Sequence, residues 1–116
     1  MREPSPRTIY CVRWRDAGIV KVGYSDESRW RIFEPRGAEV VALWQFDTCV
    51  EALDHEARCH EILECIGTPA FSSRDDAIAS RLLSSRGCGY TECFRISHSV
   101  TDSALLAKLT DGLVFR

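Results

Sequence analysis

The sequence predicts an α+β domain in which a β-hairpin opens a small antiparallel sheet and helices flank that sheet. Residues 8–24 carry the β-branched and aromatic residues of two strands around a short turn, and four later segments begin with helix-capping residues. The resulting order, β-β-α-β-α-α-β-α, lacks the regular alternation of a βαβ winding. The length of 116 residues fits one domain with one modest core. We therefore expect a flexible N-terminal tail over 1–7 and a single domain over 8–116.

The hairpin is expected to have strands over 8–14 and 19–24. A four-residue turn pairs the last residue of the first strand with the first residue of the second. This register places Tyr10 opposite Gly23 and puts Lys21 on the same face as Tyr10. A slip by one residue would separate them. Gly23 leaves room beside Tyr10 for the close approach of a ligand or of backbone.

A short helix of about ten residues is expected to follow the hairpin. Ser25 would cap it, and Asp26 and Glu27 lie in its first turn, where the helix dipole favours acids. The Pro-Arg-Gly sequence at 35–37 ends it, and residues 38–47 form the third strand.

The remaining elements are predicted mainly by their caps. Thr48 and Glu51 form a Thr-x-x-Glu capping box at the start of a long helix that Gly67 closes. The later elements are, in order, a loop over 68–73, a helix from 74 to about 85 capped by Ser73, a strand over 90–96, and a last short helix capped by Thr101 that ends near Gly112.

The formal net charge of −2 argues against a protein that coats nucleic acid through charge alone. Residues 1–36 hold eight Lys and Arg against five Asp and Glu, whereas residues 37–76 hold two against nine. The basic first third can face a polyanion, or this asymmetry is ordinary surface solvation. No run approaches the roughly 20 apolar residues of a membrane helix. The N-terminus also lacks an apolar signal segment, so we expect a cytoplasmic protein with no membrane partner.

The six cysteines include no C-x-x-C pair, which is the usual zinc signature. A disulfide framework is disfavoured without a secretory segment, and we expect most of the six to be small buried side chains. A zinc site built from Cys59, Cys65, Cys88 and Cys93 is a less favoured alternative.

Two ionisable residues of the long helix fall on its apolar side. At about 100° per residue, one broad arc holds Cys49, Val50, Ala52, Leu53, Ala57, Cys59, Leu63 and Ile66. The opposite side holds Glu51, Asp54, His55, Arg58, Glu61 and Cys65. Glu56 and His60 lie one turn apart in the middle of the apolar arc, so both point inward or into a cleft. An inward carboxylate must be paired, protonated or metal-bound, so a salt bridge between Glu56 and an arginine competes with a metal site.

The first helix carries Arg29, Trp30 and Arg31 in succession. Two guanidiniums beside an indole suit phosphate contact and base stacking. Alternatively, Trp30 packs inward with Phe33 and the arginines are simply solvated.

The runs IYC, KVGYS, RWR and GYTECF, with an inward glutamate on the intervening helix, resemble the GIY-YIG nuclease superfamily. They are most similar to its small branch, which has K-[IV]-G in place of YIG, an E-x-x-x-H helix and a terminal E-W-F strand. The resemblance covers roughly residues 8–96. Thr8 stands in place of the glycine of GIY, Lys21 in place of the second tyrosine, and Cys93 in place of the tryptophan of E-W-F.

This resemblance implies metal-assisted hydrolysis of phosphodiester bonds. The implied catalytic residues are Tyr10, which orients or deprotonates the attacking water, Lys21, Arg31, which holds the scissile phosphate, Glu56, which binds the metal, and His60. Arg29, Trp30, Gly23 and Tyr24 are assigned to substrate binding. We expect Tyr10, Lys21, Arg31 and Glu56 to converge on one concave surface, with His60 at its edge.

The implied cofactor is one Mg²⁺ or Mn²⁺ ion held by Glu56, and zinc is disfavoured. The implied partner is nucleic acid, with DNA favoured over RNA. Because the sequence has no zinc finger or helix-turn-helix, we expect weak binding, a preference for particular structures or single strands, or action with a protein partner or a second copy. Two other hypotheses compete: a degenerate domain of this family that binds nucleic acid or a protein without cutting, and a zinc-stabilised interaction module.

Overall fold

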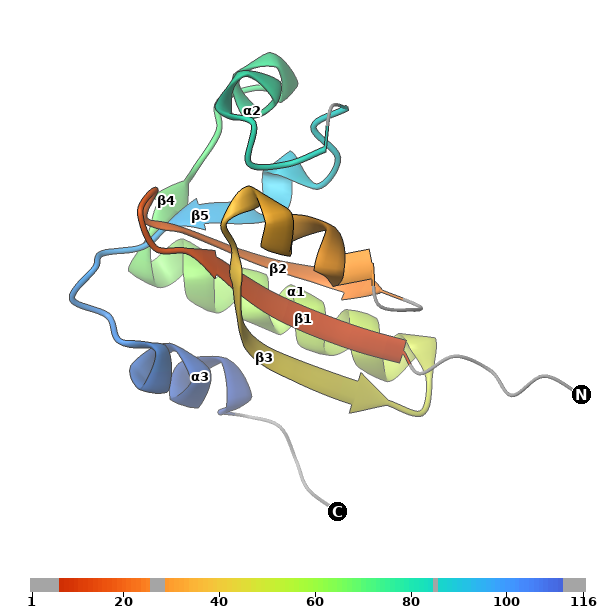
Figure 1. Cartoon of the computed structure of the whole chain (residues 1–116). Coiled ribbons are helices and arrows are strands. Elements are labelled where there is room, and N and C mark those ends of the chain that lie inside the picture. Colours follow the sequence, from red (N-terminus) through yellow and green to blue (C-terminus); the bar gives the residue numbers. More distant parts are fainter. Residues whose placement is uncertain (1–6, 26–28, 85, 112–116) are drawn as a thin grey trace, which may run out of the picture.

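A five-stranded sheet with helices packed on it confirms the predicted α+β class in the computed structural model (Figure 1). The structure describes residues 7–25, 29–84 and 86–111. The strands are β1 (Arg7–Trp14), β2 (Ile19–Ser25), β3 (Glu39–Phe46), β4 (Thr68–Pro69) and β5 (Cys93–Arg95). The helices are the 3-10 helix η1 (Arg29–Arg36), α1 (Cys49–Ile66), α2 (Arg74–Ser80), the 3-10 helix η2 (Tyr90–Glu92) and α3 (Asp102–Thr110). The sheet order is β3-β1-β2-β5-β4, and each neighbouring pair is antiparallel.

The hairpin has the predicted register. Trp14 pairs with Ile19 and Tyr10 pairs with Gly23. Every residue of β1 after the first is buried, because this strand lies between β2 and β3 and is covered on both faces. Arg7, which was expected in the tail, belongs to β1 because it pairs with β3. The rest of the predicted tail lies outside the described residues.

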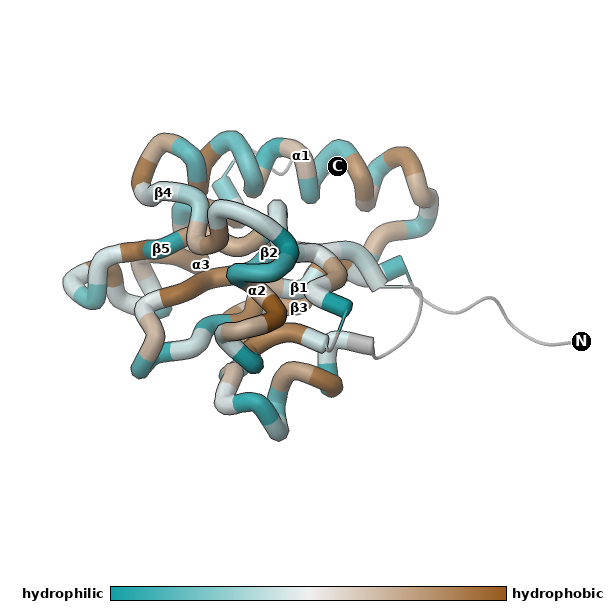
Figure 2. The backbone as a smooth tube through the Cα atoms, turned by 90° about the horizontal axis from the view of Figure 1, so that it is seen from above, coloured by the Kyte–Doolittle hydropathy of each residue, from teal (hydrophilic) through white to brown (hydrophobic). Residues whose placement is uncertain are grey.

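Helices cover both faces of the sheet, and alternate residues of β1 point to opposite cores. Ile9 and Cys11 belong to the core under α1 and α3, which we call the α1 face. Tyr10 and Val12 belong to the core under η1 and α2, which we call the η1 face. Figure 2, seen from above, shows α1 running along one side of the sheet. Within the described residues, no helix is both long and apolar enough to cross a membrane.

The first predicted helix differs from the expectation in its start and in its type. Ser25, expected as an N-cap, is the fully buried last residue of β2. Asp26 and Glu27 lie outside the described residues. The helix itself has 3-10 geometry and contains Pro35. A proline inside a helix removes a backbone donor, and short 3-10 segments tolerate this better than a regular α-helix does.

Three later segments also differ from the prediction. The loop expected over 68–73 contains β4, a two-residue strand ending in proline, which leaves no strand pattern in the sequence. The helix α2 ends before the expected residue 85, because Arg81 adopts a left-handed conformation with φ of 62°. The strand expected over 90–96 starts only at Cys93, since the three preceding residues form η2.

Three of the four predicted side-chain caps are confirmed. Thr48, Ser73 and Thr101 each accept a hydrogen bond from the backbone N–H three residues later, at 3.1 Å. These bonds satisfy donors that helix geometry leaves without partners. The bond to Thr48 also fixes where α1 begins, and therefore which residues of α1 meet the sheet.

The buried side of α1 is rotated relative to the predicted arc. Its fully buried residues are Ala52, His55, Cys59 and Leu63. Val50 is 70% exposed and Leu53 is 45% exposed, although both were expected inside. His55, expected outside, packs against Trp44 and Phe46 with ring centroids at 4.7 and 5.4 Å. Burial, with a contribution from a nearby arginine, lowers the pKa of His55 to about 4, so the neutral ring acts as an aromatic core residue.

Candidate metal centre and adjoining cavity

The hairpin places Tyr10 and Lys21 together on the η1 face. Lys21 Nζ donates a hydrogen bond to the Tyr10 hydroxyl at 2.5 Å and lies 4.8 Å from the centroid of that ring. Gly23 makes room for both groups, because a Cβ atom there would lie 2.8 Å from Lys21 Nζ and nearer still to the Tyr10 hydroxyl. The space that we expected to admit a ligand or backbone is filled by these two side chains.

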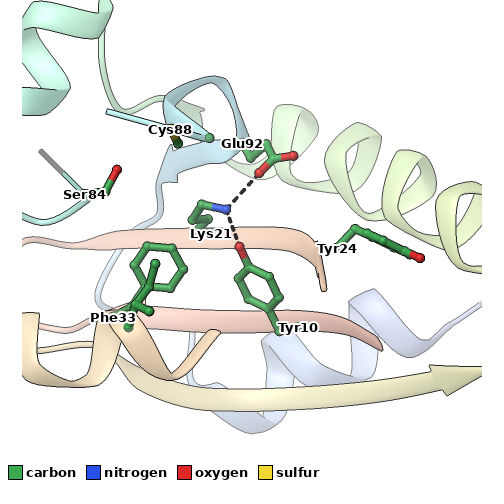
Figure 3. Close-up of a pocket in the computed structure, with 9 residues that line it drawn as sticks. Tyr10, Lys21, Tyr24, Phe33, Ser84, Cys88 and Glu92 are labelled. Atoms are coloured by element: carbon green, nitrogen blue, oxygen red, sulfur yellow. Dashed lines mark hydrogen bonds and ion pairs between the residues drawn. The ribbon is translucent and has the colours of Figure 1, made fainter. Parts of the chain in front are cut away.

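Glu92 extends this pair into a chain of three polar groups. It is the last residue of η2, directly before β5, and its Oε1 accepts a hydrogen bond from Lys21 Nζ at 2.8 Å (Figure 3). Gly89, with φ of 77°, lets the backbone pass close by, since a Cβ there would lie 2.9 Å from Lys21 Nζ. Lys21 is only 2% exposed, so the carboxylate of Glu92 compensates its charge in place of water.

The surroundings set the charge states of Lys21 and Tyr10. Burial lowers the pKa of Lys21, but Tyr10 and Glu92 together outweigh burial and leave that pKa raised, so the ammonium stays charged. Burial raises the pKa of Tyr10, and the ammonium of Lys21 offsets this only in part. Tyr10 is therefore a neutral phenol at neutral pH, better suited to orienting a bound group than to accepting a proton.

The helix α1 brings Glu56 and His60 to the same region from the other face of the sheet. Both are half-buried and lie at the edge of the buried side of α1, whereas the predicted arc placed them in its middle. His60 Nε2 donates a hydrogen bond to the backbone carbonyl of Val22 at 2.7 Å. This bond leaves the lone pair of Nδ1 free and fixes the orientation of the ring. Glu56 Oε2 is buried and has no hydrogen-bond partner among the described residues.

Glu56, His60 and Glu92 form a cluster whose ligand atoms all lie within 4.8 Å of one another. The position at which β5 begins explains where the cluster forms. β5 pairs with β2 only along Ile19–Lys21, with its first residue opposite Lys21, so β2 continues beyond the start of β5. Side chains of α1 meet β2 at this point, and Glu92 lies there because it directly precedes β5.

The donor set of this cluster fits a divalent cation. Two carboxylates and one imidazole suit Mn²⁺, and the oxygen donors suit Mg²⁺. Burial raises the pKa of Glu56, and the charge of Glu92 raises it further while His60 and Lys21 oppose. A bound cation would compensate the buried Glu56 oxygen and the two neighbouring acids. The sequence predicts Glu56 alone as a metal ligand, and the structure places His60 and Glu92 beside it.

The cysteines do not take part in this cluster, which is the only close group of three or more potential metal ligands within the described residues. All six are free; Cys11, Cys59 and Cys93 are buried, and Cys49, Cys65 and Cys88 are exposed. Burial raises the pKa of the Cys59 and Cys93 thiols to about 12, so both remain protonated. The four cysteines of the zinc alternative are therefore not gathered into a site.

A cavity of about 200 Å³ opens on the η1 face beside Lys21 (Figure 3). It is lined by Tyr10, Lys21, Tyr24, Ile32, Phe33, Ser84, Cys88, Gly89 and Glu92. Because Glu92 both lines the cavity and belongs to the metal-ligand cluster, the cavity and the cluster are adjacent.

Of the three consecutive residues of the first helix that were predicted to contact the substrate, the two whose side chains are described do not line the cavity. Arg31 is exposed, its guanidinium carbon lies 5.2 Å from the ring centroid of Trp30, and it does not line the cavity. Trp30 is half-buried and packs against the core of the η1 face, which is the inward alternative. The side chain of Arg29 lies outside the description. Tyr24 is half-buried and lines the cavity.

The structure therefore does not gather the expected catalytic residues on one concave surface. Tyr10 and Lys21 face the cavity, whereas Glu56 and His60 come from the helix on the opposite face. Glu92, to which the sequence analysis gave no role, joins the two groups. Its position in the E-W-F-like motif is the signal that could have identified it.

Comparison with models of protein families, with curated proteins and with solved structures finds no match for this chain.

Proposed function

We propose that this protein is a small metal-dependent endonuclease, similar to the GIY-YIG nucleases, that hydrolyses phosphodiester bonds in nucleic acid. The observation that supports this most directly is the Glu56–His60–Glu92 cluster beside the Tyr10–Lys21 pair. Three donor groups suited to Mg²⁺ or Mn²⁺ lie next to a buried cation and a phenol, which are groups that can bind and orient a phosphate. The Tyr10, Lys21, Glu56 and His60 positions are also those that the family resemblance selects.

The side chains of the cluster and of the Tyr10–Lys21 pair have different roles in this proposal. Glu56, Glu92 and the Nδ1 atom of His60 would hold one divalent ion, and such an ion neutralises the phosphate and stabilises the leaving oxygen. Lys21 holds the Tyr10 hydroxyl in place and adds positive charge beside the cluster. Tyr10, as a neutral phenol, donates a hydrogen bond that orients the water or the phosphate.

The exposed Arg31 suits contact with a backbone phosphate away from the reacting atoms. We favour DNA over RNA on the family resemblance. The exposed cysteines are compatible with the cytoplasm, because thiols persist in a reducing compartment. With a net charge of −2, the isolated chain should bind nucleic acid weakly at physiological salt.

A non-cutting domain that binds nucleic acid or a protein is the second candidate. Two observations favour it: Arg31 does not line the cavity, and Tyr10 and Glu56 come from opposite faces of the sheet. Such a domain would keep the cavity and the basic first third of the sequence but would release no product.

Incubation with labelled single-stranded and double-stranded DNA and RNA, in Mg²⁺, Mn²⁺ or EDTA, separates the two candidates. The nuclease proposal expects cleavage that needs the divalent ion and that Glu56→Gln abolishes. Glu61→Gln, an exposed carboxylate on the same helix, is the matched control and should retain activity. Binding without cleavage under every metal condition would favour the second candidate.

A further inference from the structure

We infer that the cavity beside Lys21 binds one unpaired nucleobase, so that the substrate is a single strand or a nucleotide turned out of a duplex. This inference rests on the proposed nuclease function and specifies the form of nucleic acid that the site accepts. Four features of the cavity support it: its size, its apolar walls, its unused polar groups and its position beside the metal-ligand cluster.

The size of the cavity selects one ring system. Its volume is about 200 Å³. An apolar cavity of roughly 150 Å³ admits a benzene ring, whereas pockets for drug-sized ligands span roughly 300–1,000 Å³. One base therefore fits, but a base pair or a dinucleotide cofactor does not.

The walls suit the faces of a base. Tyr10 and Phe33 lie with ring centroids 5.9 Å apart and planes inclined by 33°. Ile32 contributes an apolar side chain that is 52% exposed, which is unusual for a large aliphatic residue next to a cavity. Aromatic and apolar side chains stack on unpaired bases without regard to sequence, because every base has a π-face.

The cavity also contains polar groups with unused hydrogen-bonding capacity. Ser84 Oγ is buried, lines the cavity and has no hydrogen-bond partner among the described residues. Lys21 Nζ has three N–H donors, of which one bonds to Tyr10 and one to Glu92. The edge of a base carries the donors and acceptors that these groups lack, and a flipped base is recognised through that edge.

The position of the cavity connects the base to the chemistry. Glu92 lies between the cavity and the Glu56–His60 pair, and its Oε1 is 2.8 Å from Lys21 Nζ. In a nucleotide, one sugar separates the base from its phosphate. A base bound against Lys21 therefore brings its own phosphate to the side of the cavity where Glu92 meets the cluster.

A bulged duplex tests this inference without relying on cleavage. Fluorescence anisotropy in EDTA would compare a DNA duplex carrying one bulged nucleotide with the same duplex carrying a bulged abasic nucleotide. We expect the base to strengthen binding about tenfold, the typical value of one stacked base. Ile32→Asp, which replaces the apolar side chain at the mouth of the cavity with a charged one, should remove this preference, and so should Ser84→Leu. Val50→Asp, at a residue that is 70% exposed on α1, is the matched control and should leave the preference intact.

The outcomes separate this inference from the proposed function. Equal affinity for the two bulged duplexes overturns the inference, and so does a preference that persists in Ile32→Asp and Ser84→Leu. Divalent-dependent cleavage together with equal affinity would support the proposed nuclease function and contradict the base-binding cavity. A base preference that only the cavity variants lose, with no cleavage in any metal, would support the base-binding cavity and contradict the nuclease function.

Discussion

Replacement of Glu56 with Gln should stabilise the metal-free protein at neutral pH and remove its stabilisation by divalent ions. Glu56 is half-buried, its Oε2 has no partner among the described residues, and the carboxylate of Glu92 lies beside it. Gln has nearly the same shape and carries no charge. The substitution therefore removes an electrostatic cost from the metal-free fold together with a metal ligand.

The size of this cost follows from the geometry. Two carboxylates within 4.8 Å of one another repel by about 1 kcal/mol in water and by about 3.5 kcal/mol at an effective dielectric constant of 20. His60 and Lys21 offset part of this repulsion, and the side chain of Glu92 is 29% exposed to solvent. We expect a net gain of about 1–2 kcal/mol, or a rise in Tm of roughly 4–10 °C for a domain of this length.

The pH dependence has a definite sign. Burial raises the pKa of Glu56 in the folded protein, so the folded state holds this proton more tightly than the unfolded state does. The stability contributed by Glu56 is fully present below its unfolded pKa and is lost as the pH rises through the folded pKa. The difference between wild type and Glu56→Gln should therefore vanish in acid and grow toward neutral pH.

Scanning calorimetry in EDTA and in Mn²⁺, between acidic and neutral pH, measures both effects. Mn²⁺ at one hundred times its Kd should stabilise the wild type by about 2.7 kcal/mol. Glu61→Gln should behave like the wild type, whereas Glu56→Gln should gain little from Mn²⁺. A lower Tm of Glu56→Gln in EDTA at neutral pH would show that Glu56 is a stabilising anionic partner in the fold, and the metal-ligand assignment would then fail.

Three further predictions concern the surroundings of the site. Arg31→Ala should raise KM and leave kcat little changed, and the slope of log affinity against log salt concentration for single-strand binding should become about 0.7 less steep. A loss of about 10²–10³ in kcat would instead show that Arg31 acts in the transition state. Gly89→Ala should lower stability by about 2–3 kcal/mol in urea titrations, through left-handed strain and a clash with Lys21. Gly37→Ala, also left-handed but with its Cβ in ordinary contact 3.8 Å from Trp14, should lower stability only by the backbone strain of about 1–2 kcal/mol. Equal losses of stability in the two variants would exclude the clash. Thr48→Ala should lower the free energy of unfolding by about 1 kcal/mol, because the N-cap of α1 is lost. The same substitution at an exposed threonine, Thr68→Ala, should not reproduce this loss.

Local patterns in the sequence predict much of the fold. The hairpin register follows from the turn length and gives the Tyr10–Lys21 contact correctly. The caps at Thr48, Ser73 and Thr101 follow from single side chains that satisfy helix N–H groups. These features depend on residues close together in the chain, so the sequence alone determines them.

Features that depend on packing between distant segments were harder to predict. His55 was placed outside because a helical wheel scores histidine as polar, whereas the Trp44 and Phe46 rings of β3 provide it with a buried aromatic site. The strand β4 exists only because β5 supplies a partner. Glu92 was missed for the same reason: its partners Lys21 and Glu56 are far away in the sequence and come from opposite faces of the sheet.

The charges around the cluster explain why a lysine and an additional acid occur together here. Lys21 is buried, and a buried ammonium needs an anionic partner, which Glu92 supplies. Glu92 then lies close to Glu56, so two carboxylates share one ammonium, and the group carries a net charge of −1 when both acids are ionised and His60 is neutral. Protonation of Glu56 would remove this charge in acid, and the raised pKa of Glu56 makes this protonation easier than for a solvated carboxyl. A divalent ion removes it without a proton and turns the charge of the group positive, which is the sign required for holding a phosphate beside Tyr10.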